Sequence, residues 1–596
     1  MQPTIKILDR IRENSRNNKE EIFTRLYRYM LRPDLYYLAY KNLYANKGAA
    51  TKGVNDDTAD GFSTEKVNKI IRALTDGTYM PHPVRRTYVA KKQNSAKKRP
   101  LGIPTFTDKL VQEVLRMILE AVYEPVFSHY SHGFRPGRSC HTVLNSLKKE
   151  FTGVTWFIEG DIKSCFDTID HHVLVDIIGA KIKDARLIQL IWKFLKAGYM
   201  EDWQYHATYS GCPQGGIVSP MLSNIYLNEL DKFAAALAKE FYQPKAQAHT
   251  VEYDRHSYLI RKAKKQLETA TGREKTALLK QVKQLKAQLP TIPSTSKTDK
   301  VMKYFRYADD FIIGMKGDRT DCESIKRQFS EFISQTLKME LSEEKTLITH
   351  SGQYARFLGY DIRVRRDNTV KPNRDRLQRT LNYKVELCVP FDDKIMPFLF
   401  RKSIAQQQHD STIEPTARKF LYRCTDLEIV TAFNAELRGI CNYYALASNF
   451  NKLSFFAYLM EYSCLKTLAG KHKTTSRQFI SKHPDGNGGW RIPYKTAKGV
   501  SYRSFAKFMD CKDPEWFNDT IVDSSLRHAS TRSTYEDRLT AQVCELCGKT
   551  GASLEIHHVN KVKNLKGKQY WEIMMIAKKR KTLAVCKDCH HKIHHP

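Results

Sequence analysis

The sequence has 596 residues, too many for a single hydrophobic core, so we expect several domains. Lys and Arg number 98 against 64 Asp and Glu, and the resulting net charge of +34 is typical of proteins that bind a polyanion. A mean hydropathy of -0.53 and the lack of any apolar run of about 18 residues argue against membrane spans, and nucleic acid is a better expected partner than an anionic membrane.

The start of the chain and its cysteines bear on the compartment. Met1–Glu21 has no apolar signal core, and its acidic residues disfavour a transit peptide, so we expect a cytoplasmic protein. Of the 13 cysteines, four form two Cys-x-x-Cys pairs and the others are scattered without pattern, as reduced cysteines of a cytosolic protein would be. The scattered cysteines are Cys140, Cys165, Cys212, Cys322, Cys388, Cys424, Cys441, Cys464 and Cys511.

From about residue 1 to 380, strand-like apolar runs alternate with helical stretches and turn signals, which indicates a mixed α/β or α+β region. Within it, Trp156–Asp167 begins as an apolar strand, delivers Asp161 at the strand end and turns into a helix. A Lys-rich stretch from about 240 to 295 has apolar residues three and four positions apart, which predicts an inserted amphipathic helix or short helical hairpin. These apolar residues are Leu278, Val282, Leu285 and Leu289.

A second strand unit, Val301–Ile313, consists of two apolar strands around an acidic turn with Asp309 and Asp310 at its tip. Taken alone, such a turn is commonly an exposed hairpin tip. Nucleotidyl transfer, however, needs two divalent ions about 3.5–4 Å apart, and carboxylates from separate strands can bridge them. We therefore predict Asp161 and Asp309 as the bridging pair and Asp310 as more peripheral, because adjacent residues on an extended chain point apart.

The rest of the chain is helical, then basic, then rich in metal ligands. From about 391 to 480, apolar residues recur every three or four positions, which predicts a helical domain. The glycine-rich segment Asp485–Trp490 is a junction before an irregular basic stretch that runs to about 540. Two Cys-x-x-Cys pairs near the end predict a closed tetrahedral zinc site, without which about 55 residues would hardly fold alone. The predicted zinc ligands are Cys544, Cys547, Cys586 and Cys589.

The strand ending at Asp161 and the Tyr307–Asp310 box together resemble the two metal-binding motifs of reverse transcriptases. Ser210–Pro220 resembles that family's nucleotide- and template-binding loop, and Lys97–Pro104 and Ser131–Ser139 resemble motifs of its fingers. The resemblance implies a magnesium-dependent polymerase, whose catalytic metal ligands are Asp161, Asp309 and Asp310. It also implies nucleotide-binding residues, which are Arg99 on the triphosphate, Phe166 against a ribose 2′-OH, Gln214 on the nucleotide and Lys345 on pyrophosphate.

Several of these positions have structural alternatives. Phe166 would also suit a core aromatic residue, and Lys345 an ordinary solvated lysine. Arg135 and Arg138, in the second fingers motif, could equally hold template phosphates.

Arg438–Tyr444 and Ser463–Lys473 resemble the X, or maturase, domain of group II intron-encoded proteins, and that resemblance runs nearly end to end. In that family the X domain is also the polymerase thumb, and the proteins bind their own intron RNA, assist its splicing and copy it at a DNA target. The alternative is a helical packing domain without an RNA role. The residues implied to bind RNA are Arg438, Lys466, Lys471 and Lys473.

Glu555–Asn560 and Cys589–His594 resemble the histidine elements of HNH endonucleases. The resemblance implies a second, catalytic ion, with His558 as the general base that activates water. The residues implied to bind this ion are His557, His590 and His594. The alternative is a zinc ribbon that only binds DNA.

One departure from the HNH pattern concerns its central Asn. That residue is expected near Lys581 and is absent there, so Asn560 or Asn564 would have to orient the base instead.

The predicted fold class is α+β and multidomain, with right-hand reverse transcriptase fingers and palm, a helical thumb (X domain) and a small zinc-stabilised ββα HNH domain. The predicted domains are residues 1–380 for fingers and palm, 381–485 for the X/maturase thumb, 486–540 for a basic DNA-binding region and 541–596 for the HNH endonuclease.

The predicted function combines an RNA-directed DNA polymerase, a maturase and an HNH endonuclease that cuts the DNA target strand. It implies Mg2+ in the polymerase and the nuclease and structural Zn2+ at the four cysteines. The expected partners are group II intron RNA, a double-stranded DNA target, dNTPs and a second copy in a homodimer, with no membrane. The alternatives are a splicing-only RNA-binding maturase and an HNH nuclease on an inert RNA-binding scaffold.

Overall fold

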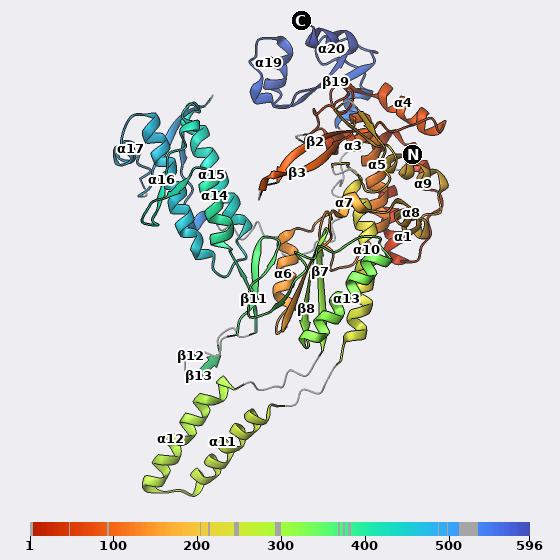
Figure 1. The fold of residues 1–596 in the computed structure, drawn as a ribbon. Coiled ribbons are helices and arrows are strands. Elements are labelled where there is room, and N and C mark those ends of the chain that lie inside the picture. Colours follow the sequence, from red (N-terminus) through yellow and green to blue (C-terminus); the bar gives the residue numbers. More distant parts are fainter. Residues whose placement is uncertain are drawn as a thin grey trace.

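The protein is a mixed assembly of helices and small sheets, with its C-terminal end packed beside its N-terminal region (Figure 1). This computed structural model describes residues 4–46, 48–91, 94–202, 204–212, 215–243, 249–292, 300–366, 370–373, 376–379, 383–486, 488–496, 499–511 and 534–595. Within these ranges no helix is both long and apolar enough to cross a membrane. The mixture of helices and strands confirms the predicted α+β class.

A four-stranded antiparallel sheet forms the centre of the molecule. Its strands, in spatial order, are β7 (Val301–Tyr307), β8 (Asp310–Lys316), β4 (Trp156–Asp161) and β9 (Ile348–His350). Along β8, Phe311 and Ile313 pack into one core and Ile312 into another, the alternation of a strand buried on both faces. The helices that supply these cores are α10 (Ser219–Phe241) and α13 (Arg319–Gln335) on one side and α6 (Cys140–Glu150) on the other.

The N-terminal region packs around α5 (Phe106–Tyr123), a helix buried along most of its length. Thr105 caps this helix by accepting a hydrogen bond from the Asp108 amide, which satisfies one of the free N–H groups of the first turn. The other N-terminal elements are α1 (Thr4–Asn17), α2 (Tyr27–Met30), α3 (Pro33–Leu43), β1 (Phe62–Ser63) and α4 (Thr64–Thr75).

A second four-stranded sheet extends from this region beside the central sheet. Its order is β3 (Asn94–Ile103), β2 (Val84–Lys91), β5 (Tyr199–Glu201) and β6 (Gln204–His206). Three helices follow β4 along the chain and precede β5: α7 (Cys165–Thr168), α8 (His171–Lys181) and α9 (Ala185–Leu195).

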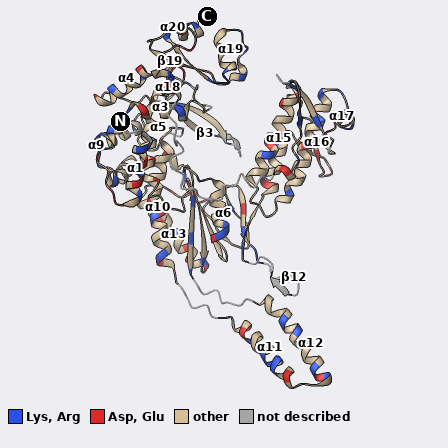
Figure 2. Cartoon of the chain, turned by 180° about the vertical axis from the view of Figure 1, so that it is seen from behind, with Lys and Arg blue, Asp and Glu red and all other residues tan. Residues whose placement is uncertain are grey.

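The predicted Lys-rich insertion is a helical hairpin of α11 (Val251–Thr269) and α12 (Gly272–Gln288) that projects away from the central sheet (Figure 1). Lys and Arg residues recur along both of its helices (Figure 2). Its narrow seam buries Ile260, Ala263 and Val282. The prediction of a helical hairpin is therefore confirmed.

The predicted helical domain is also confirmed, and a three-stranded sheet joins it to the central sheet. That sheet contains β10 (Ala355–Phe357), β11 (Tyr360–Val364) and β14 (Val385–Cys388), and a short hairpin, β12 (Val370–Asn373) and β13 (Arg376–Arg379), projects from it. The helical region contains α14 (Met396–Arg401), α15 (Asp426–Tyr443), α16 (Leu453–Lys471) and α17 (Ser476–Lys482), with the strand pair β15 (Ala405–Gln407) and β16 (Ile413–Pro415).

The core of this helical region continues beyond the predicted boundary at residue 485. Trp490 and Ile492 are buried in the same apolar cluster as α15 and α16, and so is Cys511. The hairpin of β17 (Arg491–Thr496) and β18 (Gly499–Ser504) therefore belongs to the helical region, and a separate basic domain that begins at 486 does not describe these residues. Residues 512–533 of the predicted basic region lie outside the described residues.

The C-terminal region contains the two strands and the final helix expected of a ββα unit, but a further helix lies between the strands, and the region is not a free unit. Its elements are α18 (Thr534–Thr540), β19 (Leu554–His558), α19 (Tyr570–Ala577), β20 (Thr582–Cys586) and α20 (Lys587–His594). Strand β1 of the N-terminal region pairs with β19, with Phe62 opposite Ile556 and Ser63 opposite Glu555. The two ends of the chain therefore share one three-stranded sheet, β1-β19-β20, and one apolar core.

Candidate active sites

Three carboxylates meet at one end of the central sheet. Asp161 ends β4 and lies directly opposite Asp310, the first residue of β8. Ala308 and Asp309 form the turn before it, and Ala308 adopts a left-handed backbone with φ of 57°. Because Asp309 lies in a turn and not on an extended strand, the expected alternation with Asp310 does not apply. Asp310 is the register partner of Asp161, and its more peripheral role stays a prediction.

The electrostatics of this carboxylate group are those of a cation site. Burial raises the pKa of Asp309, and the Asp161 charge raises it further against the lowering effect of Arg99 and Lys345. Burial, followed by the Asp309 and Asp161 charges, raises the pKa of Asp310 to about 7. Carboxylates that repel one another in a buried site are stabilised by bound divalent cations, so this donor set fits Mg2+.

A buried ion pair between Arg306 and Asp231 stabilises the acidic turn. Arg306 is fully buried, and its guanidinium donates to both carboxylate oxygens of Asp231, at 2.7 and 2.6 Å. The same guanidinium donates to the Ala308 carbonyl at 2.8 Å and to the Ser131 hydroxyl at 2.8 Å. Arg306 thereby fixes the backbone of the turn that carries Asp309. Neither Arg306 nor Asp231 was singled out from the sequence.

We expect Arg306→Leu to destabilise the protein by about 3–5 kcal/mol, because Asp231 would remain buried as an unpaired charge. DNA synthesis should fall as well, because the turn loses its anchor. The double change Arg306→Leu/Asp231→Leu should recover much of the stability, since it removes both charges.

Urea unfolding midpoints together with primer extension measure both effects. Arg319→Leu is the matched control, because Arg319 pairs with Glu323 on an exposed surface and should cost less than about 1 kcal/mol. Equal destabilisation by Arg306→Leu and Arg319→Leu would contradict the anchoring role.

Three of the predicted nucleotide-binding residues are described and lie near the acidic turn. Arg99 is an exposed residue of β3 that interacts electrostatically with Asp309. Phe166, on the short helix α7 just after β4, is half-buried and makes an edge contact with Phe134, so it is not a core aromatic residue. Lys345 donates to the Asp161 carboxylate at 2.7 Å.

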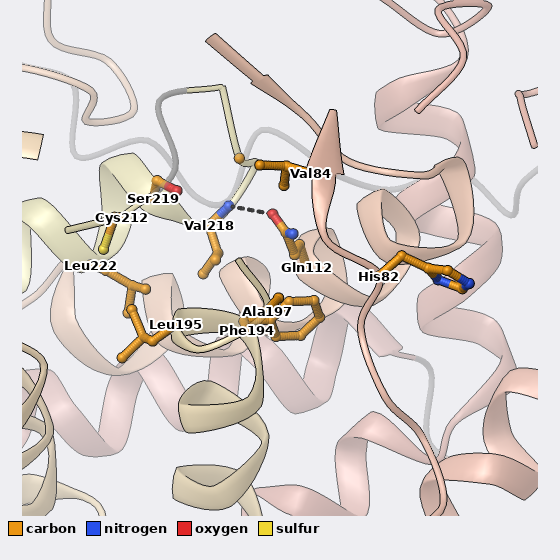
Figure 3. Close-up of a pocket in the computed structure, with 11 residues that line it drawn as sticks. His82, Val84, Gln112, Phe194, Leu195, Ala197, Cys212, Val218, Ser219 and Leu222 are labelled. Carbon is orange, nitrogen blue, oxygen red and sulfur yellow. Dashed lines mark hydrogen bonds between the residues drawn. The ribbon is translucent and has the colours of Figure 1, made fainter. Parts of the chain in front are cut away.

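The predicted nucleotide-binding loop, Ser210–Pro220, forms hydrogen bonds with the rest of the protein on both sides of its tip. Before the tip, the Cys212 amide donates to the Phe166 carbonyl at 2.7 Å. After it, the Gln112 side chain on α5 accepts from the Ile217 amide at 2.8 Å and from the Val218 amide at 3.5 Å. Gln112 and Val218 line a small cavity under this loop (Figure 3). Gln214 itself lies outside the described residues.

The second fingers motif has a structural role for one of its two arginines. Arg135 is buried, pairs with Glu124 at 2.9 Å and donates to the Ser128 and Ser131 carbonyls. Template binding by Arg135 is therefore contradicted, because its donors are used within the protein. Arg138 donates to the His129 carbonyl at 2.6 Å.

The predicted RNA-binding residues of the helical region are not equivalent. Arg438 is exposed on α15, and Lys473 is exposed just beyond the end of α16. Lys466 donates to the Pro415 carbonyl at 2.8 Å. Lys471 pairs with Asp426 at 2.6 Å, so part of its charge is neutralised in joining α16 to the start of α15.

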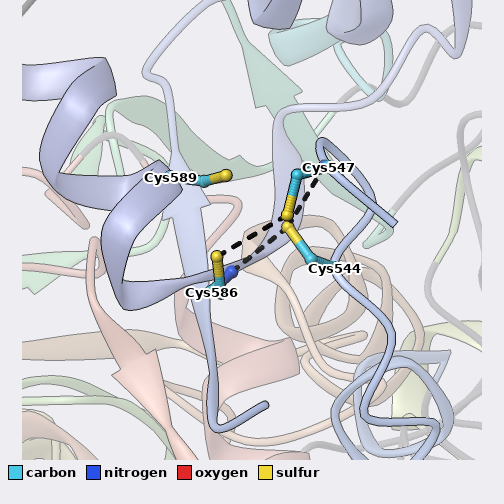
Figure 4. Close-up of side chains that lie close together, drawn as sticks. All are labelled: Cys544, Cys547, Cys586 and Cys589. Atoms are coloured by element: carbon cyan, nitrogen blue, oxygen red, sulfur yellow. Dashed lines mark hydrogen bonds between the residues drawn. The ribbon is translucent and has the colours of Figure 1, made fainter. Parts of the chain in front are cut away.

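The four C-terminal cysteines converge to one point, with ligand atoms that all lie within 4.8 Å of one another (Figure 4). The sulfur atoms of Cys547 and Cys586 are 3.8 Å apart, which is roughly the separation of two thiolates on a tetrahedral zinc ion with 2.3 Å bonds. Burial raises the pKa of Cys544, but hydrogen bonds from the Cys547, Cys586 and Leu546 amides outweigh it and lower that pKa to about 7. The cluster fits a structural zinc ion.

A second cluster brings together the three predicted histidines and one residue that was not predicted. His557, His590 and His594 lie with Asp60 so that one ligand atom from each falls within 4.8 Å of the others. Both ring nitrogens of His557 are buried, and its Nδ1 atom lies 3.2 Å from an oxygen of Asp60, so this imidazole is paired with the carboxylate of the cluster. Glu555 contacts the Nδ1 atom of His590 at 2.6 Å and orients its ring.

The predicted general base, His558, follows His557 on β19 but is not part of this cluster. Its Nε2 atom lies 3.1 Å from the Tyr44 carbonyl, which can only accept, so Nε2 carries the proton and Nδ1 is the basic nitrogen. Burial is the main cause of the lowered pKa of His558. Asn560 and Asn564 are both exposed, and the contact that orients this ring comes from Tyr44 instead.

An acidic turn beside a basic β-hairpin, joined to a ββα unit with a histidine cluster, defines a nucleic acid polymerase that carries a nuclease. The reverse transcriptase (RNA-dependent DNA polymerase) family matches residues 89–250, the type II intron maturase family residues 382–517, and the AI2M/AI1M-like HNH endonuclease family residues 544–590. The chain is therefore an RNA-directed DNA polymerase and a DNA endonuclease with a maturase region.

Whole-chain relatives identify the family. Over 597 residues, covering 100% of both chains, the protein is 59% identical to the group II intron-encoded protein LtrA of Lactococcus lactis subsp. cremoris. It is 34% identical to an uncharacterized 91 kDa protein in the cob intron of Schizosaccharomyces pombe, over 98% of this chain and 72% of that one. It is 31% identical to a COX1/OXI3 intron 2 protein of Saccharomyces cerevisiae, over 98% and 68%. The chain belongs to the family of multifunctional group II intron-encoded proteins.

Proposed function

We propose that Asp161, Asp309 and Asp310 hold two Mg2+ ions for DNA synthesis, on a palm formed by the central sheet. The observation that carries this proposal is the register of β4 and β8, which sets Asp161 opposite Asp310 at the acidic turn. When bound, such ions activate the primer 3′ hydroxyl and stabilise the leaving pyrophosphate. The hairpin of β2 and β3 then serves as fingers and the helical region as thumb.

The residues around the acidic turn bind and select the nucleotide. Arg99 holds the triphosphate, supported by its electrostatic interaction with Asp309. Phe166 closes the sugar pocket against a 2′-OH, supported by its half-buried position on α7. Lys345 donates a hydrogen bond to the departing pyrophosphate, supported by its hydrogen bond to the Asp161 carboxylate. Gln214 is proposed from sequence alone as a nucleotide contact.

In the nuclease, His557, His590 and His594 hold the catalytic divalent ion, and His558 accepts a proton from the attacking water at Nδ1. The convergence of the three histidines supports the first assignment, and the hydrogen bond from His558 to Tyr44 supports the second. The four cysteines hold a structural zinc ion. This nuclease cuts the second strand of the DNA target, and the new 3′ end primes reverse transcription.

The helical region binds the intron RNA through Arg438, Lys466, Lys471 and Lys473, of which Lys471 also pairs with Asp426. The bacterial source of the 59% identical relative supports the expected cytoplasmic location. A homodimer stays a prediction, which light scattering of the purified protein measures. The intact acidic turn disfavours both a splicing-only RNA-binding maturase and an HNH nuclease on an inert RNA-binding scaffold.

We expect His558→Ala to reduce second-strand cutting by at least about a hundredfold while leaving primer extension unchanged, because the two centres are separate. Cleavage of labelled target DNA by the purified protein with its intron RNA, run beside primer extension on an RNA template, measures both activities. His591→Ala is the matched control, an exposed histidine on α20 that is outside the cluster. Undiminished cutting by His558→Ala would refute its assignment as the base.

A further inference from the structure

The nuclease centre includes a side chain from the far end of the sequence. Asp60 lies immediately before Gly61, whose amide donates to the Ile556 carbonyl at 3.0 Å as β1 begins to pair with β19. The next residue, Phe62, is fully buried and stacks on Tyr40 with ring centroids 4.1 Å apart. Asp60 is therefore held in place by a sheet and a packed core.

Both oxygens of this carboxylate face the cluster. One lies 3.2 Å from the Nδ1 atom of His557, and the other lies 3.3 Å from the Nε2 atom of His590 and 2.7 Å from that of His594. The Asp60 side chain is only 21% exposed. Its first oxygen also accepts from the His558 amide at 2.6 Å. The carboxylate thus occupies the place where the three imidazoles converge.

The chemistry of the donor set favours a ligand role for this carboxylate over an incidental ion pair. Three neutral imidazoles alone suit zinc, copper or nickel, whereas magnesium and manganese prefer oxygen donors. A carboxylate supplies the oxygen and cancels one charge of the ion. With six coordination positions, four protein ligands still leave two for water and a DNA phosphate. Coordination by Asp60 therefore still leaves the ion accessible to water and to the DNA substrate.

We infer that Asp60 is the fourth protein ligand of the nuclease divalent ion, so that the N-terminal region of the polymerase completes the nuclease centre. This inference rests on the proposed assignment of His557, His590 and His594. The same region also orients the base, since the Tyr44 carbonyl holds His558. The nuclease therefore assembles only when the two ends of the chain are docked.

Mn2+ binding measured by electron paramagnetic resonance tests this inference. The background is the full-length, zinc-loaded chain with Asp161→Asn and Asp309→Asn, so that the polymerase centre binds little Mn2+. Asp60→Asn should weaken Mn2+ binding by at least about tenfold, and His557→Ala should weaken it similarly. The matched control is Asp56→Asn, because Asp56 is an exposed carboxylate four residues away that pairs with Lys52. Zinc content and limited proteolysis check that each variant remains folded and docked.

The outcomes separate this inference from the proposed nuclease centre. Loss of Mn2+ binding in both Asp60→Asn and His557→Ala, with second-strand cutting lost too, supports the inference. If His557→Ala weakens binding but Asp60→Asn does not, the histidine centre stands and Asp60 is not a ligand. If neither change affects Mn2+ binding, the centre itself is wrong. Tighter binding or faster cutting by Asp60→Asn would instead make Asp60 an inhibitory plug and overturn the inference.

Discussion

Asp309→Ala should reduce DNA synthesis on an RNA template by at least about a thousandfold and leave splicing intact. The acidic turn would lose one of the carboxylates proposed to hold the catalytic ions, and preorganised charge stabilisation of this kind is usually the largest single contribution to catalysis. The residues proposed to bind the intron RNA lie in the helical region and not in this turn, so splicing should persist. Primer extension and a splicing assay on the same preparations measure the two effects.

Asp254→Ala is the matched control for that experiment. Asp254 is an exposed carboxylate of the projecting hairpin, where it pairs with His249. Its replacement should leave both activities unchanged. Substantial DNA synthesis by Asp309→Ala would contradict the assigned polymerase centre, and loss of splicing would show that the turn also serves RNA binding.

Cys586→Ser should unfold the C-terminal ββα unit and abolish second-strand cutting, while primer extension continues. Structural zinc sites contribute about 10–16 kcal/mol of apparent binding free energy, more than a unit of this size gains from its own core. Docking through β1 and the shared core offsets part of that loss but cannot supply the missing thiolate. The polymerase centre lies on the central sheet and does not use these cysteines.

Zinc content, limited proteolysis and the two activity assays measure this prediction. Cys424→Ser is the matched control, a partly buried cysteine in the helical region with no place in the cluster. A protein that carries Cys586→Ser, contains no zinc and still cuts the second strand would contradict a structural role for the ion.

Local sequence patterns predicted two hairpins and the four-cysteine cluster. The two apolar runs around the acidic turn of Val301–Ile313 predicted the β7–β8 hairpin, because strands buried on both faces are apolar along most of their length. Helical periodicity predicted the α11–α12 hairpin, and ligand spacing predicted the convergence of the four cysteines. In each case the residues that interact are close in sequence or carry a distinctive spacing.

The features that were missed depend on contacts between distant segments. Asp60 and His558 are 498 positions apart, and nothing in the residues around Asp60 marks it as a ligand. Arg306 and Asp231 are 75 positions apart, and each looks like an ordinary surface charge until the fold buries the pair. The boundary at 485 was wrong for a similar reason, because glycines in Asp485–Trp490 suggested a linker while Trp490 is packed against the helices.

Anomalous scattering from Mn2+ in crystals of the full-length chain with an RNA–DNA duplex and a dNTP tests the central claim most directly. We expect two peaks about 3.5–4 Å apart at the end of the central sheet, in contact with Asp161 and Asp309. A bound duplex and nucleotide with no ion on these carboxylates, or with ions held by other residues, would contradict the account.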